Sequence, residues 1–219
     1  MKAELAPLIG NFRPREVNAV ALYELSDAVV AIAGIGAKHG YRAAEVAVAQ
    51  YRPERLVAAG IAGAISPALR VGDVGCAREV IDAETGTRYA TISGGQWVLV
   101  TSARIGDVAD KKSLLAEYGA DVVDMEGAAV AQVAKQHGLE FAAIKSISDE
   151  AAFAMPPLQR FIRDDGQFAI ARLALKAILH PEWWAALARL RSNSAVASRN
   201  LCAAVEHLLR SGQWPLASG

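Results

Sequence analysis

The sequence predicts an α/β fold with a mixed, mostly parallel central sheet, helices on both sides and an extra helical C-terminal tail. Short apolar runs of strand length alternate with longer segments of helical periodicity through the first two thirds of the chain. Glycine-rich or acidic residues follow several of these runs, where open α/β sheets place their ligand sites. One antiparallel insert, around residues 74–101, interrupts the alternation.

The predicted strands are apolar runs that end at glycine, proline or acidic residues. Residues 28–32, Ala-Val-Val-Ala-Ile, are typical of a strand that is buried on both faces. The strand over residues 55–59 leads into the glycine-rich residues 60–65, which we expect to form a turn. The predicted strands cover residues 16–25, 27–33, 55–59, 74–81, 87–92, 97–100, 122–123 and 141–147.

The predicted helices show apolar side chains at helical spacing. In residues 41–51 the apolar stripe contains Tyr41, Ala44 and Val48, and Pro53 ends the helix. Gly138 is a typical C-cap for the helix before it. The predicted helices cover residues 2–12, 41–51, 110–118 and 125–137, and most of the chain after residue 157.

Residues 1–180 are predicted to form the main domain, and residues 181–219 a helical C-terminal extension. This extension contains Trp183, Trp184 and Trp214, and it is richer in arginine than in acidic residues. Its amphipathic pattern fits packing against the domain or a dimer partner. The same pattern also fits contact with a membrane surface.

Composition excludes several classes of protein. The chain has 219 residues, of which 53% are hydrophobic, and its 23 basic and 23 acidic side chains balance, so we expect no nucleic-acid partner. It has no secretory signal pattern and no apolar run of about 20 residues, which predicts a cytoplasmic protein. Cys76 and Cys202 lie far apart and are predicted to be buried thiols. The four histidines fit no metal-binding spacing, so no metal site is predicted.

Two carboxylates mark the switch from strand to helix in residues 122–130, Val-Val-Asp-Met-Glu-Gly-Ala-Ala-Val. Asp124 fits either a ligand or a helix cap, and we interpret it as a cap. Glu126 is the natural acceptor for the two adjacent hydroxyls of a ribose. Met125 is apolar and adaptable, which suits one face of a flat ring.

A third carboxylate, Asp149, follows Ser148 at the end of the apolar residues 141–147. A carboxylic acid that is buried at a strand end can donate a proton to a ligand. We therefore expect the acidic residues at these two neighbouring strand ends to hold a ribose and a base.

Two glycine motifs follow predicted strands. Gly34-Ile35-Gly36 lacks the third glycine of a dinucleotide fingerprint, because His39 occupies that position, so no such cofactor is predicted. The second motif, Gly60-Ile-Ala-Gly-Ala, fits either a structural turn or a set of amides beside an anion.

Taken together, these motifs resemble the purine nucleoside phosphorylase superfamily, and most closely its 5′-methylthioadenosine/S-adenosylhomocysteine nucleosidase branch. The similarity covers roughly residues 1–150. It depends on Gly34-Ile-Gly36, Gly60-Ile-Ala-Gly-Ala, Leu69-Arg-Val-Gly-Asp-Val74, Val123-Asp-Met-Glu126 and Ile147-Ser-Asp149, in this order and at these spacings.

The resemblance implies cleavage of the N-glycosidic bond of a purine nucleoside by an enzyme without a cofactor. Met125 and Glu126 would contact the ribose, Asp149 would act at purine N7, and Glu4, in Met1-Lys-Ala-Glu4, would activate the attacking water. The predicted substrate-binding set also includes Gly34, Gly60, Ile61, Ala62 and Ser148. The resemblance further implies a homo-oligomer, commonly a dimer.

This sequence departs from the family at two points. The family begins with a buried strand before the methionine that aligns with Met1, and the given sequence has none. Its loss would expose a sheet edge and displace Glu4, so an inactive nucleoside-binding or assembly subunit is an alternative function. Where the phosphorylases bind phosphate, this sequence has Ala58 and Ile61, which favours water as nucleophile. Phosphorolysis, with Arg42 or another arginine at phosphate, is the alternative reaction.

The later part of the chain resembles the hopanoid-associated phosphorylase-like branch. The resemblance rests on Pro156-Pro-Leu158, Asp165-Gly-Gln-Phe168 and the helical extension. Those relatives release adenine from a 5′-lipid-substituted adenosine. The expected substrate is therefore a 5′-substituted adenosine, with peripheral membrane contact through residues 181–219.

Overall fold

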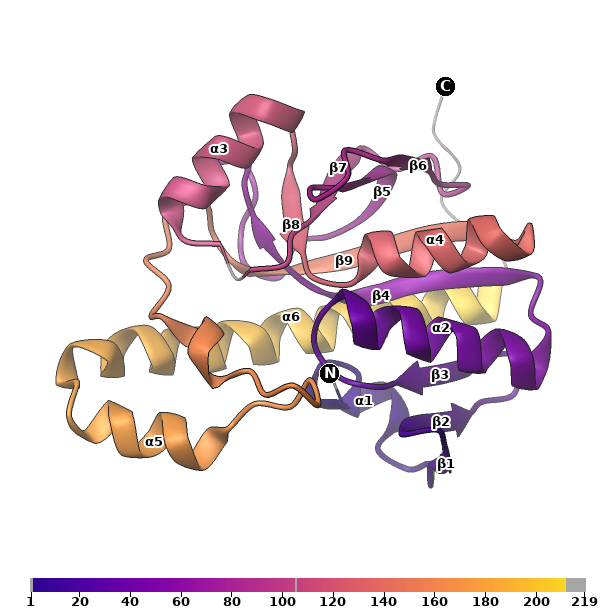
Figure 1. Cartoon of the computed structure of the whole chain (residues 1–219), viewed down its shortest axis with the longest axis horizontal. Coiled ribbons are helices and arrows are strands. Elements are labelled where there is room, and N and C mark those ends of the chain that lie inside the picture. Colours follow the sequence, from indigo (N-terminus) through magenta and orange to yellow (C-terminus); the bar gives the residue numbers. More distant parts are fainter. Residues whose placement is uncertain (1, 105, 212–219) are drawn as a thin grey trace.

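The computed structural model describes residues 2–104 and 106–211, and its α/β architecture confirms the predicted fold class (Figure 1). Met1 and Trp214, named in the predictions above, lie outside the described residues. The larger sheet has the strand order β6-β5-β7-β8-β4-β9, and β5 also pairs with β9, so five strands close into a ring. Its strands are β4 (Arg55–Ala64), β5 (Val74–Asp82), β6 (Arg88–Ala90), β7 (Trp97–Thr101), β8 (Val122–Asp124) and β9 (Glu140–Asp149).

Strand β9 is the centre of the core. Every residue from Phe141 to Asp149 is buried, and the strand pairs with β4 in parallel and with β5 in antiparallel orientation. Helix α4 (Gly127–His137) packs in front of β4 and β9, and α6 (Trp184–Ser211) packs behind them (Figure 1). A strand covered on both faces favours apolar side chains, as in residues 141–144, and its buried charged residues Lys145 and Asp149 have charged partners within the protein.

The glycine-rich residues 60–65 do not form the predicted turn. Strand β4 continues through them to Ala64, paired with β9 and, at its end, with β8. The register shifts between Ala62 and Gly63, where β9 has one extra residue. Glycine in a strand often marks a place that another group approaches closely, and the glycines of β4 fit that role better than a turn.

A separate antiparallel sheet contains β1 (Arg15–Val17), β2 (Val20–Glu24) and β3 (Val29–Ile32). The single strand predicted over residues 16–25 is wrong, because Asn18 and Ala19 turn the chain back with φ of 49° and 58°. A two-residue hairpin turn requires left-handed residues, which asparagine tolerates. Alanine gives no such signal, so the hairpin is difficult to predict.

The helices cover the sheets and form the C-terminal part of the chain. Helix α2 (Ala37–Tyr51) starts four residues earlier than predicted, directly after the Gly34–Gly36 loop. Not all of the chain after residue 157 is helical, since residues 162 and 168 form an isolated β-bridge. The remaining helices are η1 (Lys2–Glu4), α1 (Ala6–Ile9), α3 (Val108–Tyr118), η2 (Leu158–Phe161), α5 (Ile170–Ile178) and η3 (Pro181–Trp183).

Helix α6 joins the two ends of the described chain. Leu201 and Cys202 are buried in one cluster with Leu5, Ile9 and Ile144. The Ser198 hydroxyl donates a hydrogen bond to the Glu4 carbonyl over 2.7 Å. The C-terminal helix therefore fixes the position of η1 and α1 against the sheet.

A cavity of about 920 Å³ separates the two sheets. Consecutive residues of β3 and of β4, up to Gly60, line it, and no strand in the described part of the chain pairs with the facing edge of β4 over residues 55–62. This edge of β4 is therefore unpaired within the described residues. The cavity reaches the carboxyl end of β3, where open α/β sheets bind ligands, and the middle of β4 at Gly60.

Both cysteines in the described residues are buried and unpaired, as predicted. No helix in the described ranges is both long and apolar enough to cross a membrane.

Replacing Leu201 with alanine should destabilise the fold by about 2–5 kcal/mol, because a fully buried leucine leaves a cavity that cannot close completely. Leu175→Ala is the matched control, since Leu175 is 66% exposed and its loss should cost no more than about 0.5 kcal/mol. Urea unfolding curves would measure both free energies of unfolding. Equal losses in the two variants would contradict the packing of α6.

Candidate active site

Glu126 lies between β8 and α4 and reaches the loop that precedes α2. The Gly36 amide donates a hydrogen bond of 2.6 Å to its Oε1 atom. Gly40 is also close, since a Cβ atom there would lie 3.0 Å from the Cβ of Glu126. The structure therefore brings the first glycine motif and the predicted ribose-binding carboxylate together, as a shared site requires.

Behind Glu126, Asp124 and Lys145 form a buried ion pair. The Lys145 ammonium lies 2.7 Å from Asp124 Oδ2, and both residues are at most 5% exposed. The Thr101 hydroxyl donates to Asp124 Oδ1 over 2.7 Å, and the Gly127 amide donates to Oδ2 over 2.9 Å. Asp124 does accept a hydrogen bond at the start of α4, and it is also the counter-ion of Lys145.

Glu4 joins this group of charges from the N-terminal side. Its Oε2 atom accepts a hydrogen bond from the Ile61 amide over 3.3 Å. A Cβ atom on Gly60 would lie 3.1 Å from the same oxygen and 3.5 Å from Lys145 Nζ. Glu4 is therefore held at the sheet, although none of the described strands lies between β3 and β4.

The four groups hold three carboxylates against one ammonium. Burial raises the pKa of Glu126, Asp124 raises it further, and the Gly36 amide and Lys145 lower it, leaving a pKa of about 7. Burial opposes the charge of Lys145, but Asp124, Glu126 and Glu4 outweigh burial, so the pKa of Lys145 is raised. Glu126 can therefore exchange a proton near neutral pH.

The cavity between the sheets ends at this charge cluster. Its lining includes Glu4, Gly34, Gly60, Glu126 and Lys145. Its volume, about 920 Å³, is large enough for a small organic ligand. Met125, Ser148 and Asp149 are not among the described residues that line it.

Asp149 lies beside Gly63, three residues beyond Gly60 along β4. At about 3.3 Å per strand residue, this places it roughly 10 Å from the Glu4 end of the cavity. Its Oδ2 atom is 2.5 Å from Lys111 Nζ, and the Ser148 hydroxyl donates to Oδ1 over 2.7 Å. All three side chains are buried, so the predicted N7 ligand already has a charged partner within the protein.

The other predicted site residues lie around these two groups. Met125 is half-buried between β8 and α4. Gly34 lines the cavity, and it also packs against Gly166, whose Cα would be 3.0 Å from a Cβ at Gly34. Ala62 is buried in β4, and its carbonyl accepts a hydrogen bond from Ser148.

Sequence reasoning missed two lysines. Lys145 lies within an apolar strand, and a lysine among buried residues almost always has a charged partner, so the sequence does contain a signal for it. Lys111 gave no such signal, because the sequence around it resembles an exposed helix. Its burial depends on contacts that are distant in sequence, since Nζ donates to Asp149 Oδ2 and to the Glu150 carbonyl.

No three His, Cys, Asp or Glu side chains within residues 2–104 and 106–211 are grouped in a way that could hold a metal ion.

Comparison with known sequences identifies one family. The model of the phosphorylase superfamily matches residues 9–103 and 90–179, which together make up most of the chain. A comparison with curated proteins finds no match.

Solved nucleosidase structures have a similar fold. The 5′-methylthioadenosine/S-adenosylhomocysteine nucleosidase of Neisseria meningitidis, in complex with methylthio-immucillin-A, has a TM-score of 0.72 at 18% identity, over 96% of each chain. The corresponding nucleosidase of Colwellia psychrerythraea, in complex with adenine, has a TM-score of 0.71 at 19% identity, over 96% of this chain and 91% of the other. The futalosine hydrolase of Helicobacter pylori has a TM-score of 0.66 at 18% identity, over 95% of each chain.

The raised pKa of Glu126 predicts a pH-dependent stability. Glu126 has a pKa of about 7 in the folded protein, against 4.5 for the ordinary group. The bound proton therefore stabilises the folded state fully below pH 4.5, and this stabilisation is lost as the pH rises through 7. Relative to Glu126→Gln, the parent should therefore lose stability between pH 5 and pH 8. Urea unfolding at both pH values measures this difference. Glu16→Gln, an exposed carboxylate in β1, should behave like the parent, and a pH-independent difference for Glu126→Gln would refute the shift.

Removing Lys111 should leave Asp149 as an uncompensated buried charge. We expect Lys111→Met to destabilise the protein by about 3–5 kcal/mol, and Lys111→Met with Asp149→Asn by less than the sum of the two single losses. Lys112→Met, at the exposed neighbouring position of α3, is the control and should change stability by no more than about 0.5 kcal/mol. Additive losses in a urea-unfolding mutant cycle would mean that the two side chains do not interact.

Proposed function

Because the chain belongs to the phosphorylase superfamily, we propose that it hydrolyses the N-glycosidic bond of a 5′-substituted adenosine and releases adenine. Membership makes it a nucleosidase or a nucleoside phosphorylase, and the choice of water and of substrate is our proposal. The main support is the cluster of Glu4, Glu126 and Lys145 at the end of a ligand-sized cavity. The similar folds of nucleosidases bound to adenine or to a nucleoside analogue add to it.

In the proposed reaction, Glu126 accepts hydrogen bonds from the 2′ and 3′ hydroxyls of the ribose. The bond between C1′ and N9 breaks with its electron pair moving to the purine, and C1′ develops oxocarbenium character. Water then bonds to C1′, and Glu4 takes up its proton. Lys145 lies close to Glu4 and Glu126, and its ammonium stabilises the negative charge of these carboxylates.

The purine needs a proton on N7 to leave as a neutral base. Asp149 would stabilise the purine once N7 has taken up a proton from solvent, and the Lys111 ammonium contacts the same carboxylate. The separation of roughly 10 Å between Gly63 and Gly60 along the strand matches the length of a nucleoside that extends from base to ribose. Lys111 must then share the Asp149 carboxylate with the purine ring.

Phosphorolysis is the second candidate, and one observation favours it. Arg42 Nε is buried and has no hydrogen-bond partner, although another nitrogen of the same guanidinium contacts His39 Nδ1. An unpaired buried donor near the Gly34–Gly36 loop could bind a phosphate oxygen. Against phosphate stand the apolar side chains of Ala58 and Ile61.

The nature of the 5′ substituent rests on resemblance alone. We propose a lipid chain, as in the hopanoid-associated branch, and a cytoplasmic homodimer with peripheral membrane contact through residues 181–219. Adenine release from adenosine, methylthioadenosine and a 5′-alkyl adenosine, compared at equal concentration, would rank the substituents.

Adenine release with and without inorganic phosphate tests the proposed reaction. Equal rates, with the free 5′-substituted ribose as product, are expected for hydrolysis, and a 5′-substituted ribose 1-phosphate formed only with phosphate would establish phosphorolysis instead.

Asp149→Asn should reduce turnover by about 10²–10⁴-fold, because general acid assistance is lost. Glu16→Gln serves as the control for both assays. An Asp149→Asn variant with the rate of the parent would exclude this carboxylate from the reaction.

A further inference from the structure

Helix α5 (Ile170–Ile178) stands away from the rest of the molecule (Figure 1). None of its residues is buried, and its closest packing is with the short helices η2 and η3 on either side. It nevertheless contains seven apolar residues besides two basic ones. Its exposed large side chains, with those that follow it, are Ile170 at 73%, Leu175 at 66%, Ile178 at 67%, Leu179 at 68% and Trp184 at 57%.

The exposed apolar residues of α5 occupy one continuous face. At about 100° per residue, Ile170, Ile178, Leu175 and Leu179 and the alanines between them span an arc of about 180°. Leu173 and Ala177 are the half-buried positions, and Arg172 and Lys176 form one edge of the exposed arc. The helix therefore presents half of its circumference to solvent as hydrocarbon, bordered by cations.

An exposed tryptophan is fixed at the end of this face. The Trp184 indole nitrogen donates a hydrogen bond of 2.6 Å to the Ala177 carbonyl, in the last turn of α5. The neighbouring Trp183 ring stacks on His180, with centroids 4.3 Å apart. The apolar face and the Trp184 ring are thus held together as one surface.

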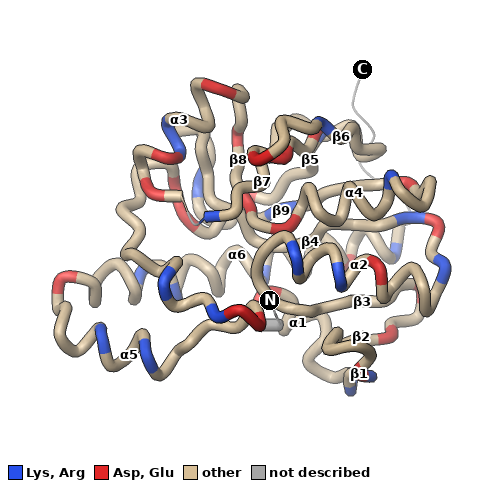
Figure 2. The backbone as a smooth tube through the Cα atoms, in the orientation of Figure 1, with Lys and Arg blue, Asp and Glu red and all other residues tan. Residues whose placement is uncertain are grey.

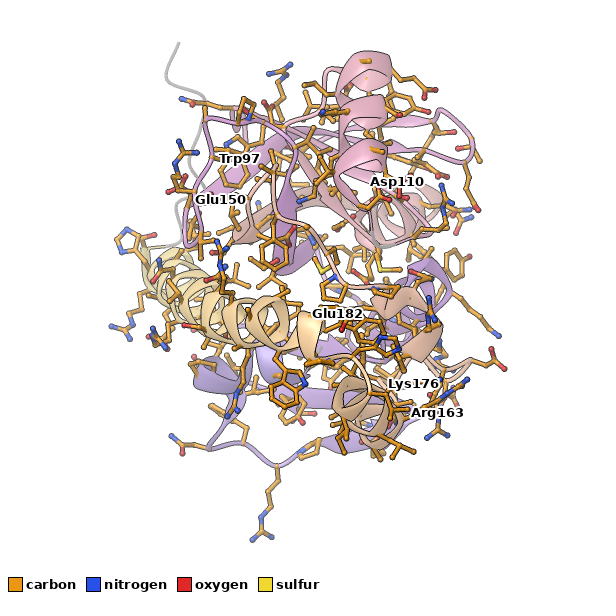
Figure 3. All side chains as sticks on the ribbon, turned by 90° about the vertical axis from the view of Figure 1, so that its left-hand side faces the viewer. Trp97, Asp110, Glu150, Arg163, Lys176 and Glu182 are labelled. Carbon is orange, nitrogen blue, oxygen red and sulfur yellow. The ribbon has the colours of Figure 1, made fainter. Side chains whose placement is uncertain are left out.

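The surroundings of α5 are basic, whereas the whole chain is neutral. Residues 158–191 contain six arginines and lysines and three acidic residues, which gives a formal charge of +3. Two of the acidic side chains are paired within this segment, Asp165 with Arg163 and Glu182 with His180. Figure 2 shows basic but no acidic positions along α5, and Figure 3 places Arg163 and Lys176 on this side of the molecule.

From these observations we propose that the exposed face of α5, together with Trp184, docks on an anionic lipid surface. Large aliphatic side chains, a tryptophan and a cationic edge are the combination that holds a short helix in the plane of the membrane interface. In an antiparallel pair of α5 helices from two copies, Arg172 and Lys176 would lie against their own counterparts, and these like charges would repel. Anionic lipid headgroups would neutralise the same cationic edge, which favours a lipid surface over a second copy.

The docking helix is connected to the candidate active site. In the loop before α5, the Gly166 carbonyl accepts a hydrogen bond of 2.8 Å from the Ile35 amide, and the Asp164 carbonyl lies 3.2 Å from His39 Nε2. Ile35 precedes Gly36, which holds Glu126. The loop before α5 therefore covers the Gly34–Gly36 loop. A lipid surface bound by α5 would lie on the same side of the molecule.

Vesicle co-sedimentation of the full chain tests the proposal. Binding should be strong with vesicles of phosphatidylglycerol and phosphatidylcholine, weak with phosphatidylcholine alone, and reduced by salt. Leu175→Asp with Ile178→Asp should abolish binding. Arg172→Glu with Lys176→Glu should weaken the partition coefficient for anionic vesicles by at least about 30-fold, since each basic residue near a charged membrane contributes about fivefold.

Two controls make the result specific. Leu115→Asp replaces a leucine of α3 that is 42% exposed and should leave vesicle binding unchanged. Thermal unfolding of each variant checks the fold, which should persist because α5 has no buried residue. No binding to anionic vesicles, or binding that survives the two α5 aspartates, would overturn the proposal. A dimer in light scattering that these aspartates dissociate, without vesicle binding, would assign the face to a second copy. The binding assay needs no substrate, so its failure leaves the proposed reaction untouched.

Discussion

The buried ion pair of Lys145 and Asp124 is the constraint on which the candidate site depends. An ammonium in the middle of the most buried strand is tolerated only with a counter-ion and further hydrogen bonds. Thr101 and the Gly127 amide fix Asp124, so the pair joins β7, β8, β9 and the start of α4 at one point. With Glu126 beside it the cluster has more negative than positive charge. The raised pKa of Glu126 follows from this excess as well as from burial.

The position of Glu4 depends on the other end of the chain. Ser198 and Cys202 of α6 both donate to the Glu4 carbonyl, and Leu201 packs among the residues of α1. These contacts hold the N-terminal carboxylate at the Ile61 amide even though the edges of β3 and β4 face a cavity. The C-terminal helix therefore contributes to the site as well as to the core.

The sequence was sufficient for the fold class and for most strands and helices, because apolar periodicity and terminal glycines are local signals. It was insufficient for the hairpin at Asn18, where Ala19 adopts a left-handed conformation without a side chain that favours it. Closure of the sheet into a ring depends on pairing between β5 and β9, which are far apart in sequence. Lys111 could not be identified for the same reason, since its partner Asp149 lies 38 residues away.

The glycines of β4 connect these observations. Their sequence suggested a turn, yet the chain there is extended, and turn geometry cannot explain them. A Cβ atom would approach Glu4 Oε2 to 3.1 Å at Gly60 and Asp149 Oδ2 to 3.0 Å at Gly63. Each glycine therefore makes room for a carboxylate that crosses the strand. The two positions mark the two charge clusters, one with Lys145 and one with Lys111, so the spacing of the glycines records the separation between the proposed ribose and base ends of the site.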